Sequence, residues 1–128
     1  MVYIYPMHLT VSDFFHASHM LPDSEYLITK ECTRLHGHTY IAKVEIESDE
    51  LKTGMIVDFK AIKDIIKLFD HRHVNDVLKE NGWEKEATAE NIARFIKNKI
   101  TTDLKFTTVS VSVCEGYKGE ELSSWVTA

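Results

Sequence analysis

The chain has 128 residues, of which 44% are hydrophobic and 27% charged, with a formal net charge of −5. This is ordinary for a soluble globular protein, and the length suits one domain over residues 1–128 but leaves no room for a second. Charges of both signs are interspersed without the basic stripe of a nucleic-acid-binding domain, and no apolar run could span a membrane. The first ten residues lack a signal-peptide layout and the two cysteines form no disulfide framework, so we expect a cytoplasmic protein.

Alternation of apolar and polar residues predicts two long strands in the first part of the chain. They are expected over about residues 2–17 and about residues 35–47. The apolar faces of these strands consist of Leu9, Val11, Phe15, Ala17, Tyr40, Ala42, Val44 and Ile46. Pro6 indicates an edge position or a bulge near the start of the first strand.

Two amphipathic helices are predicted next, each beginning after a good N-cap. Asp58 and Thr88 carry side chains that accept hydrogen bonds from the free N–H groups of a helix start. Apolar residues recur at helical spacing after each cap: Ile62, Ile65, Ile66 and Phe69, then Ala89, Ile92, Phe95, Ile96 and Ile100. A third strand over about residues 104–115 ends with Glu115 on its valine face, and a short strand is expected around residues 122–126.

The resulting order, β-β-α-α-β-β, predicts an α+β fold. Runs of strands and helices favour a four-stranded antiparallel sheet with two helices on one face. Such a sheet has two free edges and one uncovered face, which favours association with further copies.

The segment from Cys32 to His38, read together with His19, indicates a metal site. His36 and His38 point to the same side of a strand because they are two residues apart. Catalytic zinc usually has three protein ligands and one open position, so His19 could supply the third imidazole from the end of the first strand. Cys32 could then lie beside the metal as a reactive thiol.

Spacing alone leaves a second interpretation open. The chain has seven histidines, and His71 and His73 repeat the same spacing. His36 and His38 could therefore be surface or hydrogen-bonded core residues, and Cys32 could be an inert loop thiol.

Several motifs in register give the chain a resemblance to a known family. The matching segments are Phe15-His16-Ala17-Ser18-His19, Cys32-Thr33-Arg34-Leu35-His36-Gly37-His38, Phe69-Asp70-His71 with Val74-Asn75, Thr88-Ala89-Glu90-Asn91, and Glu115. In this order they resemble the 6-pyruvoyltetrahydropterin synthase family, which includes 6-carboxytetrahydropterin synthase. The resemblance implies the tunnelling fold, in which monomers join edge to edge into a barrel as trimers stacked into hexamers.

The resemblance also implies roles for individual residues. His19, His36 and His38 would bind Zn²⁺, and Cys32 would be the catalytic base, assisted by Asp70 and His71, often from another subunit. Glu115 would anchor the pterin through paired hydrogen bonds, and Thr88 could add a contact. Glu115 could equally be a solvated strand-end acid, Thr88 only a helix cap, and the Asp70-His71 pair an ordinary charged helix end.

Two departures concern the pterin pocket. Relatives commonly have a hydroxyl residue where this chain has Gly116, and often a proline where it has Ala87.

The implied activity is that of a zinc-dependent lyase. It would convert 7,8-dihydroneopterin triphosphate to 6-carboxytetrahydropterin, a precursor of deazapurine-modified nucleosides such as queuosine, with release of triphosphate and acetaldehyde. The nearest alternative is 6-pyruvoyltetrahydropterin synthase, which uses the same substrate without carbon–carbon cleavage. An alternative of another class is a non-catalytic zinc-binding oligomeric scaffold.

Overall fold

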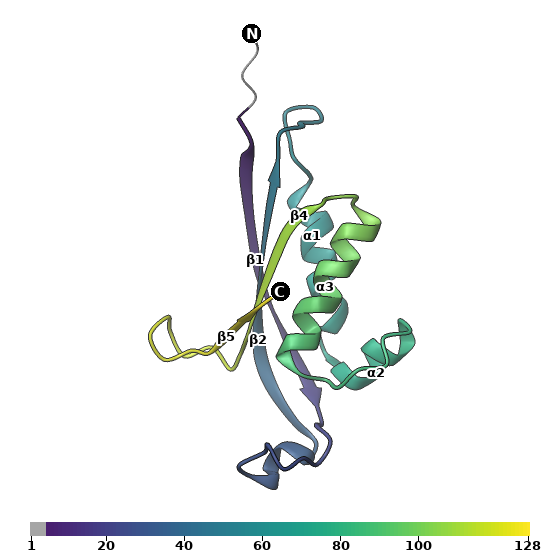
Figure 1. Ribbon diagram of the computed structural model, residues 1–128, viewed down its shortest axis with the longest axis vertical. Helices are drawn as coiled ribbons and strands as arrows, with labels where there is room; N and C mark the ends of the chain where they lie inside the picture. Colours follow the sequence, from purple (N-terminus) through teal and green to yellow (C-terminus); the bar gives the residue numbers. More distant parts are fainter. Residues whose placement is uncertain (1–4) are drawn as a thin grey trace.

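A long antiparallel hairpin forms the centre of the sheet in the computed structural model, which describes residues 5–128 (Figure 1). Its strands are β1 (Met7–His19) and β2 (His36–Ser48), which pair along their whole length, from Met7 opposite Ser48 to His19 opposite His36. The expected early start of the first strand lies partly in residues 1–4, outside the described residues. Pro6 immediately precedes β1.

The sheet has five strands in the order β3-β1-β2-β4-β5. The further strands are β3 (Arg72–His73), β4 (Thr108–Glu115) and β5 (Trp125–Thr127). The prediction of four antiparallel strands was wrong in this detail, because β3 pairs parallel to β1. A strand of two residues is too short to show an alternating pattern.

Helices cover one face of this sheet (Figure 1). The α-helices are α1 (Phe59–Ile66), α2 (Val74–Glu80) and α3 (Ala89–Asp103), and the short 3₁₀ turns are η1 (Lys30–Thr33) and η2 (Lys67–Phe69). Both predicted caps are confirmed, since Asp58 accepts from the Lys60 N–H at 2.9 Å and Thr88 from the Asn91 N–H at 3.2 Å. The sequence reading missed α2, whose seven residues are too few for a periodic stripe.

The core lies between the sheet and the helices. Phe15 stacks on Tyr40, with ring centroids 4.9 Å apart, and on Phe69 at 5.3 Å. The opposite face of β1 is exposed at His8, Thr10, Ser12, Phe14 and His16. At the paired ends of β1 and β2, the side chains point to the same helix-covered face of the sheet as the core residues. The histidines there lie next to the hydrophobic core, at its edge.

No helix in the described part of the chain is long and apolar enough to cross a membrane.

Candidate metal centre and substrate site

Three strands bring four potential metal ligands together at one end of the sheet. His19 is the last residue of β1, and its partner His36 is the first residue of β2. His38 follows on the same face of β2, and Glu115 ends β4 opposite Tyr40. The period-2 geometry of the strands therefore turns all four side chains to one side.

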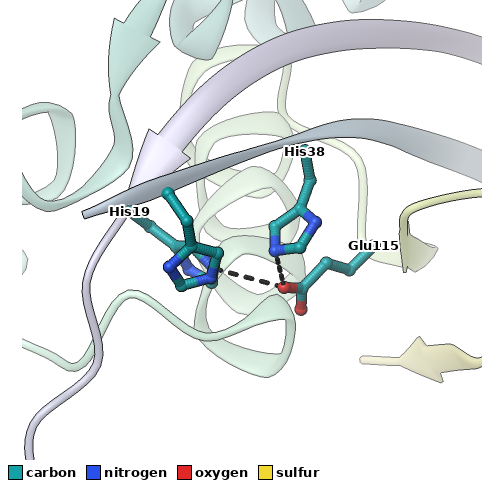
Figure 2. Close-up of side chains that lie close together, drawn as sticks. His19, His38 and Glu115 are labelled. Carbon is teal, nitrogen blue, oxygen red and sulfur yellow. Dashed lines mark ion pairs between the residues drawn. The ribbon is translucent and has the colours of Figure 1, made fainter. Parts of the chain in front are cut away.

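The potential ligand atoms of His19, His36, His38 and Glu115 all lie within 4.8 Å of one another. The Glu115 Oε1 atom is 3.2 Å from His19 Nε2 and 2.5 Å from His38 Nε2 (Figure 2). The predicted trio of histidines is thus brought together, and Glu115 lies beside it. Glu115, which the resemblance assigns to the pterin, therefore lies directly against the three histidines.

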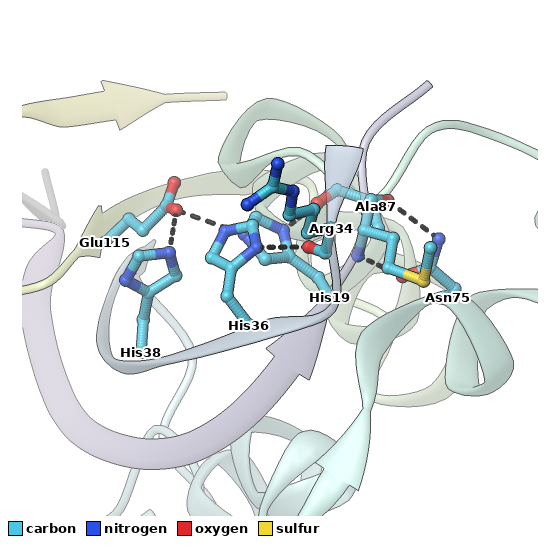
Figure 3. Close-up of polar contacts among 8 residues, drawn as sticks. His19, Arg34, His36, His38, Asn75, Ala87 and Glu115 are labelled. Carbon is cyan, nitrogen blue, oxygen red and sulfur yellow. Dashed lines mark hydrogen bonds and ion pairs between the residues drawn. The ribbon is translucent and has the colours of Figure 1, made fainter. Parts of the chain in front are cut away.

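Backbone carbonyls orient two of the imidazoles (Figure 3). The Nδ1 atom of His19 donates to the carbonyl of Ala87 at 2.7 Å, and Nδ1 of His36 donates to the carbonyl of Arg34 at 2.6 Å. A hydrogen bond at Nδ1 fixes the tautomer and leaves Nε2 with a free lone pair, which is the usual arrangement around metal-binding histidines.

Two buried imidazole nitrogens have no regular hydrogen bond among the described residues: Nε2 of His19 and Nε2 of His38. His19 is only 1% exposed, so water does not readily satisfy its nitrogen. Their close polar neighbour is Glu115 Oε1, and two buried imidazole nitrogens that converge on one carboxylate oxygen without a regular hydrogen bond need an explanation. Zinc, which binds neutral imidazole nitrogen and carboxylate oxygen, fits this set of donors.

The electrostatics of the cluster are set by burial and by Glu115. Burial lowers the pKa of His38, and the neighbouring imidazoles of His19 and His36 add to this effect against the attraction of Glu115. Burial also opposes protonation of His19, but Glu115 and the Ala87 carbonyl together raise its pKa. Contact with His19 holds the pKa of Glu115 below its usual value, although burial acts in the opposite direction. A metal ion requires neutral imidazoles and an ionised carboxylate, so the lowered pKa values of His38 and Glu115 favour metal binding, whereas the raised pKa of His19 opposes it.

Cys32 lies in the loop that joins β1 to β2, on the 3₁₀ turn η1, and it is a half-buried free thiol. Its backbone carbonyl accepts a hydrogen bond from the N–H of Leu21 at 3.0 Å, which ties the two arms of the loop together. The thiol is not a member of the ligand cluster. This separation suits a group that would act on a substrate beside the metal rather than bind the metal.

Asp70 and His71 lie elsewhere in the same chain. Asp70 accepts a hydrogen bond from the N–H of His16 at 3.0 Å, and its other carboxylate oxygen lies 3.1 Å from His71 Nδ1. The His71 ring packs edge-on against His16, on the face of β1 opposite His19, and its side chain is 79% exposed. A single chain therefore does not bring the pair to the histidine cluster. An open depression of about 570 Å³ adjoins His71 along β1, β2 and β3.

The expected helix-cap role of Thr88 is confirmed by its bond to Asn91. Sequence reasoning missed the contribution of the residue before it, because Ala87 acts on His19 through a backbone carbonyl, which no side-chain pattern reveals. It also missed the structural role of Asn75. The Asn75 amide accepts from the N–H of Met20 at 3.0 Å and donates to its carbonyl at 2.9 Å, which fixes the chain directly after His19 (Figure 3).

The chain is similar to several known proteins. A protein from Haemophilus influenzae named 6-carboxy-5,6,7,8-tetrahydropterin synthase is 33% identical over 110 residues, which cover 66% of this chain and 78% of that protein. A Pyrococcus furiosus protein named dihydroneopterin monophosphate aldolase is 34% identical over 79 residues, covering 59% of this chain and 63% of that protein. The structure of Caenorhabditis elegans 6-pyruvoyl tetrahydropterin synthase has the same fold, with a TM-score of 0.69 at 21% identity, over 100% of this chain and 99% of that one.

Some relatives are much longer than the part that matches. A Pyrococcus horikoshii relative is 46% identical over 56% of this chain, and the match spans 41% of that relative's length. A Pyrococcus abyssi relative is 47% identical over 45% of this chain, and the match spans 35% of its length. The family model described as 6-pyruvoyl tetrahydropterin synthase matches residues 8–125, which include every residue of the histidine cluster. The chain belongs to the 6-pyruvoyl tetrahydropterin synthase family.

Proposed function

We propose that this chain is a zinc-dependent lyase that converts 7,8-dihydroneopterin triphosphate to 6-carboxytetrahydropterin, with release of triphosphate and acetaldehyde. One observation carries the proposal: three histidines from two paired strands have ligand atoms within 4.8 Å of one another and of Glu115. The name of the Haemophilus influenzae relative supports the 6-carboxy product.

His19, His36 and His38 would hold the zinc ion through Nε2. Zinc held there would supply Lewis-acid stabilisation of the negative charge that develops when a proton leaves the carbon beside a side-chain hydroxyl. The hydrogen bonds to Ala87 and Arg34 keep two of these imidazoles in the orientation that metal binding needs.

Cys32 is our candidate for the group that accepts the substrate proton. It lies on the loop between His19 and His36, and its thiol is half-buried rather than enclosed in the core. A general base must come within hydrogen-bond distance of the proton it removes, so the proposal requires the Cys32 thiol to lie that close to the bound substrate.

Asp70 and His71 would act on a site formed with a second copy of the chain. His71 is largely exposed and has a positive φ of 56°, an uncommon backbone conformation outside glycine that is often kept for function. The Asp70 carboxylate orients the exposed ring, as a proton-transferring histidine requires. The edge of the sheet beside the short strand β3 would then lie at a subunit boundary in a trimer or hexamer.

Glu115 would recognise the pterin ring. Its carboxylate could accept two parallel hydrogen bonds from a ring N–H and the adjacent amino group, and its side chain is 34% exposed. Thr88 is the weaker candidate for a pterin contact, because its hydroxyl already accepts from the Asn91 N–H.

Product analysis tests this proposal and separates it from the alternatives. Zinc-loaded protein would be incubated with 7,8-dihydroneopterin triphosphate, with His36→Ala as the matched inactive variant, and products identified by mass. We expect 6-carboxytetrahydropterin with equimolar acetaldehyde from the parent only. A pyruvoyl product without acetaldehyde would establish the 6-pyruvoyltetrahydropterin synthase alternative. A parallel incubation would offer dihydroneopterin monophosphate in place of the triphosphate. Turnover of the monophosphate but not of the triphosphate would favour the reaction that the Pyrococcus furiosus name describes. Bound zinc without any turnover would favour a scaffold.

A further inference from the structure

The carboxylate of Glu115 lies where an open zinc position would be expected. Its Oε1 atom is 3.2 Å from His19 Nε2, close to the spacing of about 3.3 Å between ligands around a tetrahedral zinc ion, and 2.5 Å from His38 Nε2, which is an ion-pair contact shorter than that spacing. The whole four-residue cluster fits within 4.8 Å. Three imidazoles and one carboxylate would therefore close the coordination sphere, whereas catalytic zinc needs a free position for substrate.

Glu115 is held less firmly than His19 and His36. His19 and His36 are each held by a hydrogen bond at Nδ1 to a backbone carbonyl. Among the described residues, by contrast, the ion pairs of Glu115 are only with His19 and His38. Its side chain is 34% exposed, against 1% for His19.

The backbone at Glu115 is fixed by hydrogen bonds, and the next residue carries no side chain. Glu115 is the last residue of β4, and the N–H of Gly116 donates to the carbonyl of Thr39 at 3.0 Å. Gly116 has a φ of +69°, and a Cβ atom there would come within 3.9 Å of His38 Nδ1. The chain thus turns away directly after Glu115 and places no side chain against the His38 ring at that point.

We propose that Glu115 is the fourth zinc ligand of the resting protein and that binding of a pterin ring draws it away. The paired N–H donors of the pterin compete for the carboxylate, and its departure makes the fourth position available to the side chain of the substrate. This inference rests on the proposed zinc and pterin function. It adds a specificity mechanism, because a molecule with adjacent hydroxyls but no pterin edge would meet a closed site.

Cobalt substitution tests the exchange without relying on turnover. Co²⁺ replaces zinc in the full chain, and thiocyanate is titrated while the visible spectrum of the metal is recorded, with and without unsubstituted pterin. The variants are Glu115→Gln and, as a matched control in the turn after β4, the exposed Glu121→Gln. Metal affinity is measured in parallel by competition with a chelator.

The parent and Glu121→Gln are expected to bind thiocyanate weakly, and pterin should strengthen this binding measurably. Glu115→Gln should bind thiocyanate tightly without pterin and should lose about ten-fold or more in zinc affinity. Thiocyanate binding to the pterin-free parent as tight as that to Glu115→Gln would overturn the inference and leave the proposed function intact. Failure of the parent to bind cobalt or zinc would overturn both.

Discussion

The His19 imidazole donates from Nδ1 to the backbone carbonyl of Ala87, 2.7 Å away and 68 positions later in the chain. Ala87 directly precedes Thr88, the N-cap of α3, so the start of this helix determines where the carbonyl points. The orientation of a proposed zinc ligand on β1 therefore depends on the packing of α3 against the sheet.

Replacement of Thr88 by alanine should affect both stability and metal binding. Loss of the cap is expected to lower the free energy of unfolding by about 1 kcal/mol. It should also weaken zinc binding several-fold, because the Ala87 carbonyl is less well fixed. Denaturant unfolding and a chelator competition would measure the two effects, with Thr101→Ala on the exposed part of α3 as the control. A Thr88→Ala protein with parental stability but weak pterin binding would instead assign Thr88 to the substrate.

Replacement of Cys32 by alanine should separate catalysis from folding. The variant is expected to keep its fold and its zinc, since the thiol is not in the ligand cluster. Loss of a general base should reduce kcat by about 10²–10⁴-fold. The matched control is Cys114→Ala, which alters a buried cysteine of β4 and should cost stability but not turnover. Parental kcat in Cys32→Ala would exclude the thiol as the base.

Mixed oligomers test whether Asp70 and His71 serve the site of another copy. Cys32→Ala and His71→Ala, each inactive alone, would be unfolded together in equal amounts and refolded. If the two residues come from different chains, random mixing should restore about a quarter of parental turnover. Each variant refolded alone provides the control. Mass spectrometry would verify that mixed oligomers have formed. Inactive mixed oligomers would show that Cys32 and His71 of one site belong to the same chain.

Asp70 should contribute to stability in a pH-dependent way. The hydrogen bond from the His16 N–H is the main reason that the pKa of Asp70 lies below its ordinary value of 3.8. A carboxyl with a lowered folded-state pKa stabilises the protein above its unfolded pKa and loses this contribution as pH falls through the folded value. The stability advantage of the parent over Asp70→Asn should therefore persist from pH 6 to about 4 and shrink below 3.8. Urea unfolding across this range measures it, and a constant difference would contradict the assignment. The exposed Asp49→Asn serves as control.

Much of this fold could be predicted because its main elements are long and periodic. The alternation in β1 and β2 and the apolar stripes of α1 and α3 extend over several repeats, and Asp58 and Thr88 are recognisable caps. The short β3 and α2 could not be predicted from a local pattern. Their positions depend on the parallel pairing of β3 with β1, which joins segments far apart in the sequence.

The candidate site was predictable to a similar degree. The two-residue spacing of His36 and His38 suffices to place both on one face of β2. The position of Glu115 beside them depends on the register between β2 and β4, in which Tyr40 lies opposite Glu115. These two residues are far apart in sequence, so no local pattern specifies their pairing. The carbonyls that orient His19 and His36 belong to backbone groups, which any residue type provides.

The most direct test of the account is a calorimetric zinc titration of metal-stripped protein. The parent and His8→Ala, which alters an exposed histidine on the uncovered face of β1, should each bind one zinc ion per chain. His19→Ala, His36→Ala and His38→Ala should each bind zinc far more weakly, because each loses one of the three imidazoles that would hold the metal. Binding of one zinc ion with parental affinity by all three variants would contradict the central claim.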